Sequence, residues 1–262
     1  MTTTLQLLTE GDLILQGRLR GASNTTLRGT VTLDGVTARC VYKPISGERP
    51  LWDFPDGTLA AREVAAYVVS AATGWDIVPA TVLRDGPLGP GACQLWVETR
   101  RGSAGLRVGF VPAAAVPAGW HPVVEAIDDD GTEYVLAHAD DEALARMALL
   151  DVVINNADRK GGHVLHARDG SLHGVDHGVT FHVEDKLRTV LWGFMGRPIP
   201  AVELAVLTAL RAALQGAVRD ALSLLLTADE LAATTARVDR LLVERVFPAP
   251  AMGRRSLPWP PI

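Results

Sequence analysis

The sequence predicts an α+β protein of two lobes, in which a β-rich amino-terminal part precedes a helical carboxyl-terminal half. Short β-branched and aliphatic runs separated by turn pairs fill the first third of the chain, and one helical stretch interrupts them. After residue 140, apolar residues recur at helical spacing, with a single short hairpin among them. Strands and helices that are segregated along the chain favour an α+β fold over a parallel α/β sheet.

The first lobe is predicted to span residues 1–98 and to consist mainly of strands. Its strand-like runs end at turn pairs such as Asp34-Gly35, which favour two-residue hairpins. One helix interrupts the strands, because Thr58 is a suitable N-cap and Gly74 a suitable cap after the last turn. The expected elements are strands over 29–33, 38–43, 81–84 and 92–98 and a helix over 59–73.

The middle of the chain, residues 99–135, shows little periodicity and contains several prolines. We predict a hinge or connector there, although an ordinary surface loop gives the same pattern. Residues 136–262 are predicted to form a helical second lobe with one short hairpin around Asp169-Gly170. A capping box at Thr227 and Glu230 begins its last helix, and the proline-rich end of the chain is expected to be irregular.

Composition limits the classes of function. The chain has 262 residues, 48% of them hydrophobic and 21% charged, and a formal net charge of −5. An acidic chain is a poor general binder of nucleic acid or of an anionic membrane, since both require a cationic face. The amino terminus lacks targeting features and no apolar run is long enough to span a membrane, which favours a cytoplasmic protein without stable membrane insertion. Two cysteines, Cys40 and Cys93, are expected to be buried thiols.

Two carboxylates flank the predicted hairpin of the second lobe. Asp158 precedes its first strand and Asp176 follows its second, so the antiparallel pairing brings them near each other. Carboxylates held close together repel unless a cation lies beside them. One acid could then position a nucleophile while the other holds Mg²⁺ on a phosphate. Two surface turns would give the same pattern, so this pair alone leaves both interpretations open.

A lysine stands at the end of an otherwise apolar strand, in Cys40-Val41-Tyr42-Lys43. Burial of an ammonium group is costly unless it is paired, and Glu63 lies within the largely apolar helix that follows. Protein kinases pair a strand lysine with a helix glutamate to hold the phosphates of ATP. If both residues face solvent, the pattern carries no function.

Two further segments are candidates for ATP contacts. The turn that contains Ser23 and Asn24 could place backbone N–H groups over phosphates, although an ordinary hairpin turn explains it equally well. Gln94 and Val97 lie where a strand would leave the first lobe, and such a hinge could offer backbone groups to adenine. A plain core strand accounts for the same residues.

These residues and their order resemble the atypical kinases of the phosphatidylinositol 3-/4-kinase superfamily. The local similarity is to type II phosphatidylinositol 4-kinases and HipA-like kinases, and it rests on residues 150–159 and 175–179. The whole chain also resembles actinobacterial proteins labelled kinase-like. The resemblance implies a bilobal protein-kinase-like fold that binds ATP and Mg²⁺. It also implies that Asp158 orients the substrate hydroxyl.

The same resemblance implies roles for three other residues. Asp176 would hold Mg²⁺, Lys43 would bind the ATP phosphates, and Glu63 would fix Lys43 in place. The family motif has an asparagine metal ligand where this sequence has His163. Magnesium prefers oxygen ligands, so three alternatives follow. His163 has another role, Asn156 supplies the missing oxygen, or metal binding is weakened as in a pseudokinase.

The sequence therefore predicts an ATP- and Mg²⁺-dependent phosphotransferase that acts on an alcohol. The acceptor is, in order of preference, a small soluble alcohol or sugar, a protein Ser/Thr, or a phosphoinositide. Lys186, Arg188 and Arg197 could meet an anionic acceptor, or could lie on a solvated loop. A nucleotide-binding pseudokinase that regulates a protein partner is the alternative, and nucleotidyl transfer at the same site is a third reading.

Overall fold

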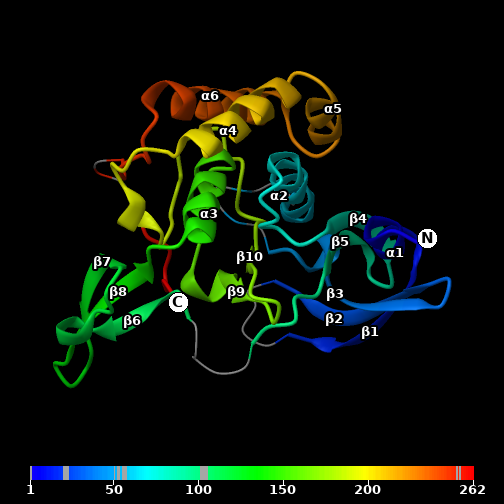
Figure 1. The fold of residues 1–262 in the computed structure, drawn as a ribbon. Helices are drawn as coiled ribbons and strands as arrows, with labels where there is room; N and C mark the ends of the chain where they lie inside the picture. Colours follow the sequence, from blue (N-terminus) through cyan, green and yellow to red (C-terminus); the bar gives the residue numbers. More distant parts are fainter. Residues whose placement is uncertain are drawn as a thin grey trace.

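The amino-terminal lobe is built around a five-stranded antiparallel sheet with the strand order β1-β2-β3-β5-β4 (Figure 1). The computed structural model of this chain describes residues 2–19, 24–49, 51, 54, 58–100, 106–251, 253 and 255–262. The strands are β1 (Asp12–Arg18), β2 (Leu27–Leu33), β3 (Val36–Pro44), β4 (Thr81–Gly86) and β5 (Gly89–Leu95). The predicted hairpin at Asp34-Gly35 is present between β2 and β3, and both residues have positive φ.

One helix covers each face of this sheet. Helix α1 (Thr4–Glu10) buries Leu7 and Leu8 against Cys40 and Cys93. Helix α2 (Leu59–Thr73) packs on the opposite face, where Ala60 and Val64 contact Ala92. Alternate residues of a strand point to opposite faces, so Cys93 packs against α1 and its neighbour Ala92 packs against α2. Both cysteines are buried free thiols, as predicted.

Helix α1 was not predicted, because the first 45 residues read as strands. It begins with a capping box in which Thr3 and Gln6 exchange hydrogen bonds, a recognisable signal that was missed. Helix α2 has the predicted bounds, and Gly74 ends it at φ 67° in the left-handed region. Thr58 is its N-cap residue, but the side chain makes no capping bond. The Glu48 carboxylate instead accepts hydrogen bonds from the Leu59 and Ala60 N–H groups, at 3.2 and 2.8 Å.

The segment 99–135, predicted as a hinge or connector because it showed little periodicity, contains regular structure that the sequence analysis did not anticipate. A second antiparallel sheet forms there, with β6 (Val108–Pro112), β7 (Trp120–Ile127) and β8 (Glu133–Ala139) in the order β6-β8-β7. The prolines concealed the strands, yet Pro122 lies beside a register shift in the edge strand β7, where its missing N–H is tolerated. Asp128 forms the hairpin turn by accepting hydrogen bonds from the Asp130 and Thr132 N–H groups.

The carboxyl-terminal lobe is mainly helical. Asp141 caps α3 (Glu142–Val153) by accepting from the Ala143 and Leu144 N–H groups. The short hairpin of β9 (Val164–His166) and β10 (Leu172–Gly174) follows, as predicted. The remaining helices are α4 (Ala201–Ala213), α5 (Ala217–Ser223) and α6 (Ala228–Glu244), with single 3₁₀ turns at Ile45–Gly47, Ala113–Ala115, Gly161–His163 and Trp192–Phe194. The predicted fold class, a β-rich amino-terminal lobe followed by a helical carboxyl-terminal lobe, is confirmed.

Helix α2 joins the two lobes, because it contacts β4 and β5 on one side and α4 and α5 on the other (Figure 1). The main core lies beneath α3, α4 and α6 and includes Leu149, Leu150, Leu207 and Leu241. In the part of the chain that is described, no single helix is both long and apolar enough to cross a membrane. Helices α4 and α5 reach that length and composition only as a pair, and a bend of 65° separates them.

Candidate active site

Lys43 and Glu63 form an ion pair between strand β3 and helix α2. Strand register explains why they meet: Lys43 lies opposite Ala92 of β5, so it points to the face of the sheet that α2 covers. The Glu63 side chain is only 3% exposed. Burial alone would lower the pKa of Lys43, but the carboxylates of Asp176 and Glu63 outweigh it and hold the pKa above its ordinary value. The lysine is therefore a fixed cation.

Asp176 provides the second carboxylate on Lys43, with Nζ–Oδ1 at 2.9 Å. It follows β10, and its φ of 63° is unusual for a residue other than glycine. Such backbone strain is typical of functional sites. The next residue is anchored as well, because the His177 N–H donates to Glu63 Oε2 at 3.0 Å. The nearby ammonium of Lys43 lowers the pKa of Asp176, which is ionised at neutral pH.

Asp158 lies in the loop between α3 and the hairpin, and it lines the same cleft as Lys43, Glu63 and Asp176. The cleft has a volume of about 560 Å³. Asn156 Oδ1 accepts a hydrogen bond from the Asp158 N–H at 3.0 Å, which fixes the turn. Burial raises the pKa of Asp158, although Lys160 Nζ at 3.2 Å acts in the opposite direction. The predicted convergence of the two aspartates on one cavity is present.

A buried ion pair anchors this loop. Arg159 and Asp151 are both fully buried, and the guanidinium donates to both carboxylate oxygens at 2.9–3.1 Å. Arg159 also contacts His177 Nε2 at 2.6 Å and donates to the Val175 carbonyl at 3.2 Å. One side chain thus ties helix α3 and the Asp158 loop to the segment that carries Asp176.

His163 is a candidate metal ligand from the sequence analysis, and it lies close to Asp176. Its Nε2 is 3.5 Å from Asp176 Oδ2, and its buried Nδ1 has no hydrogen-bond partner among the described residues. Burial lowers the pKa of His163 to about 4, so the ring is neutral at physiological pH. Within the described ranges no three His, Cys, Asp or Glu side chains are grouped to hold a metal ion. Magnesium is commonly held by one or two carboxylates together with substrate phosphates, and Asp176 suits that arrangement.

Asn156 has a different placement from the one predicted. Its amide donates to Asp151 Oδ1 at 2.9 Å while its carbonyl oxygen accepts from the Asp158 N–H, so both ends of the buried side chain are engaged. This placement gives no support to Asn156 as a metal ligand. Its role is to position Asp158.

The predicted ATP contacts are only partly brought together. Asn24 lines the cleft, and its Oδ1 accepts from the Arg49 N–H at 2.9 Å. Ser23 lies outside the described residues. Gln94 is buried and donates to Thr81 Oγ1 at 2.8 Å, while Val97 lines a separate cavity of about 550 Å³. The prediction that Gln94 and Val97 form the adenine hinge therefore has no support from the cleft.

Trp259 and Glu48 are among the residues of the cleft that the sequence analysis did not predict. Trp259 lines it although it is remote in the chain, because the carboxyl-terminal tail returns to the Asp158 loop. The Gly161 N–H donates to the Pro261 carbonyl at 2.9 Å, and Pro258 and Pro261 are buried on either side of the exposed Trp259. Glu48 also lines the cleft while it caps α2. Neither residue has a local sequence signal.

Fold and site together define a two-lobed α+β protein whose cleft combines a paired strand lysine with two aspartates. The chain is 49% identical to Protein Rv2133c of Mycobacterium tuberculosis over 260 residues, which cover 97% of this chain and 93% of that protein. It belongs to the same family as Protein Rv2133c. No family model matches the chain. Among solved structures, it is similar to the Helicobacter pylori proinflammatory kinase CtkA, with a TM-score of 0.43, 11% identity and coverage of 92% of this chain and 94% of that one.

Proposed function

We propose that this protein is an ATP- and Mg²⁺-dependent phosphotransferase of the atypical kinase type, which moves the γ-phosphoryl group to an alcohol. The observation that carries the proposal is the placement of Lys43, between Glu63 and Asp176 in a cleft that Asp158 also lines. Phosphoryl transfer requires little more than positioning and charge neutralisation, and kinases supply both with a strand lysine, a helix glutamate and two aspartates.

Each residue has a separate task in this proposal. Lys43 binds phosphate oxygens of ATP, and Glu63 keeps its ammonium group in the cleft. Asp176 would hold Mg²⁺ together with phosphate oxygens, and the bound cation would neutralise charge on the transferring group. Asp158 accepts the proton of the acceptor's hydroxyl group while the hydroxyl oxygen forms a bond to the γ-phosphorus of ATP. The bond from that phosphorus to the β–γ bridging oxygen breaks, and ADP leaves.

Asp158 suits the acceptor side of the cleft. Its raised pKa makes it a better proton acceptor than an ordinary surface aspartate. The Asn156 hydrogen bond and the buried Arg159–Asp151 pair hold its loop in place. In this proposal residues 1–98 and 136–262 form the two lobes that enclose ATP. Asn24 lines the cleft as a predicted nucleotide contact together with Lys43 and Glu63.

A nucleotide-binding pseudokinase is the second candidate. The observation that favours it is His163, whose neutral imidazole faces Asp176 at 3.5 Å in the place of an oxygen ligand. In that case ATP would bind with little dependence on Mg²⁺, and the protein would act through a partner.

Calorimetric titration with ATP, with and without Mg²⁺, tests the proposal. The phosphotransferase requires metal-dependent binding that is lost in Lys43→Ala. It should be retained in Arg28→Ala, which removes an exposed cation from the neighbouring strand β2. Binding that ignores Mg²⁺ supports the pseudokinase, and absence of binding under both conditions overturns both functions. Release of ADP in the presence of acceptors then separates turnover from binding.

A further inference from the structure

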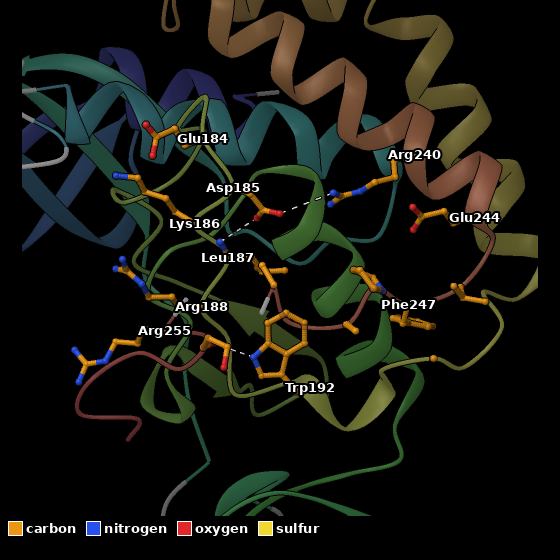
Figure 2. A pocket seen from close by; sticks show the side chains of 16 residues that line it. Glu184, Asp185, Lys186, Leu187, Arg188, Trp192, Arg240, Glu244, Phe247 and Arg255 are labelled. Atoms are coloured by element: carbon orange, nitrogen blue, oxygen red, sulfur yellow. Dashed lines mark hydrogen bonds and ion pairs between the residues drawn. The ribbon is translucent and has the colours of Figure 1, made fainter. Parts of the chain in front are cut away.

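A second cavity of about 540 Å³ lies beside the catalytic cleft (Figure 2). Its walls come from the segment after Asp176, the end of helix α6 and the carboxyl-terminal tail. Trp192 and Phe247 give it an apolar side. The tail is fixed to this segment, because the Ser256 carbonyl accepts hydrogen bonds from Trp192 Nε1 at 2.9 Å and from the Thr189 N–H at 3.1 Å. The cavity is therefore part of the folded lobe.

The cavity and the cleft share Arg188, which lines both. Its backbone is hydrogen-bonded to the catalytic loop on both sides: the Arg188 N–H donates to the Asn156 carbonyl at 2.9 Å, and the Arg159 N–H donates to the Arg188 carbonyl at 3.0 Å. The Lys186 N–H likewise donates to Asn155 Oδ1 at 2.9 Å. These bonds fix the basic segment relative to the loop of Asp158.

The charges of the cavity are distributed unevenly. Figure 2 shows Lys186, Arg188 and Arg255 along one side, with their cationic groups directed the same way, away from Trp192. The Glu184 carboxylate lies near Lys186 on this side, and Glu244 lies on the opposite side near Arg240. Asp185 lies away from them and is paired with Arg240 at 3.8 Å. Arg197, which was also predicted to meet an anion, does not line this cavity. It pairs with Asp140 at 2.7 Å and lies over the Phe194 ring.

We propose that this cavity is the acceptor site and that it takes an alcohol that carries a phosphate group. This inference rests on the proposed phosphotransferase function. Arginine presents a planar fork of donors that matches phosphate oxygens, and Arg188 and Arg255 supply two such groups. The phosphate binds on this basic side, the carbon skeleton contacts Trp192, and the free hydroxyl extends past Arg188 to Asp158. A sugar phosphate and a phosphoinositide headgroup share this chemistry.

Direct binding to the full-length protein, without ATP, tests the site. The probes are glucose 6-phosphate, glycerol 3-phosphate and inositol 1-phosphate, each compared with its unphosphorylated counterpart by calorimetry. We expect at least one phosphorylated probe to bind about tenfold or more tightly than its counterpart, as a charge-assisted hydrogen bond allows. Arg255→Ala should remove most of this difference, whereas Arg219→Ala, an exposed arginine outside the cavity, should not. Equal affinities within all three pairs, or an unchanged preference in Arg255→Ala, overturn the proposal.

Two further arms identify the source of the phosphate and separate the two proposals. Sedimentation with phosphatidylcholine vesicles that contain phosphatidylinositol, compared with pure phosphatidylcholine, detects a lipid headgroup, and soluble probes detect a free metabolite. Preference for phosphate in either arm supports the site. Titration of Arg255→Ala with ATP and Mg²⁺ reports on the catalytic cleft separately, and its affinity for ATP should equal that of the wild type. Phosphate preference without ATP binding would remove the phosphotransferase function, and the cavity would then no longer be an acceptor site.

Discussion

Replacement of Arg159 by methionine removes the cation that connects α3, the Asp158 loop and the Asp176 segment. Arg159 and Asp151 are both fully buried. Among the described residues, the Asp151 carboxylate of Arg159→Met keeps only the hydrogen bonds from Asn156 Nδ2 at 2.9 Å and Thr189 Oγ1 at 3.3 Å. It loses three contacts from the guanidinium within 3.1 Å. A buried negative charge is then left without a counter-charge.

Loss of one partner from a buried ion pair costs about 3–5 kcal/mol. A domain typically has about 5–15 kcal/mol of stability, so this single change removes a large share. For a chain of this size the expected decrease in Tm is about 6–20 °C. The double variant Asp151→Asn/Arg159→Met removes the unpaired charge too, and should recover at least about 1 kcal/mol relative to Arg159→Met.

Urea unfolding followed by tryptophan fluorescence measures these free energies. Arg211→Met is the matched control, because Arg211 pairs with Asp239 at 2.6 Å but the two side chains are 28% and 49% exposed. A partly exposed pair contributes about 0–1 kcal/mol. The reasoning about this buried pair is refuted if the free energies of unfolding of Arg159→Met and Arg211→Met differ by less than about 1 kcal/mol. It is also refuted if the double variant is no more stable than Arg159→Met.

Three further predictions follow from other sites. Burial lowers the pKa of His138 to about 4. As pH falls from about 6.5 to 4, the His138 imidazole is therefore protonated in the unfolded chain but stays neutral in the folded chain. The free energy of unfolding should decrease by about 3 kcal/mol over that range. His138→Gln should show a shallower pH dependence in urea titrations, and an unchanged slope would contradict this origin. Glu63→Gln should weaken binding of ATP with Mg²⁺ by about tenfold or more, because Lys43 loses its buried carboxylate. Calorimetry checks this, with exposed Glu10→Gln as control, and equal affinity of the two variants would contradict it. Trp259 is 73% exposed where it lines the cleft. Trp259→Ala should leave the free energy of unfolding within about 0.5 kcal/mol of the wild type. It should weaken the binding of ATP with Mg²⁺ about two- to tenfold. Loss of stability without loss of affinity for ATP would mean that Trp259 stabilises the fold rather than contacting the ligand. The control is Leu224→Ala, which also truncates an exposed apolar side chain.

The sequence determined those features that depend on local chemistry. The helix over 59–73 required only helix-forming residues and Gly74 at a left-handed position, and the β2–β3 hairpin required Asp34-Gly35. The second sheet escaped prediction because strands β6–β8 are stabilised by pairing with one another. The pairing of β6 with β8 joins residues distant in sequence, and although β7 and β8 form a local hairpin, Pro112 and Pro122 obscured the strand pattern.

Part of the site could also be predicted from local chemistry. A lysine at the end of an apolar strand and a glutamate within an apolar helix both require partners if they are buried. The kinase pattern suggested pairing Lys43 with Glu63, and the structure contains that pair. Asp158 and Asp176 were linked by the hairpin between them. The engagement of Asn156 with Asp151, and the burial of Gln94 on Thr81, depend on packing that no spacing reveals.

Tertiary structure alone decided which distant segments complete the site. Trp259 reaches the cleft because Pro261 accepts a hydrogen bond from Gly161, and Arg188 lies between two cavities because its backbone bonds to the loop of Asp158. Each contact closes a long stretch of chain, and it forms only when the folded core compensates the entropy of that closure. The sequence by itself therefore identified the charged residues that require partners, while the packing of the lobes decided which of them face one another.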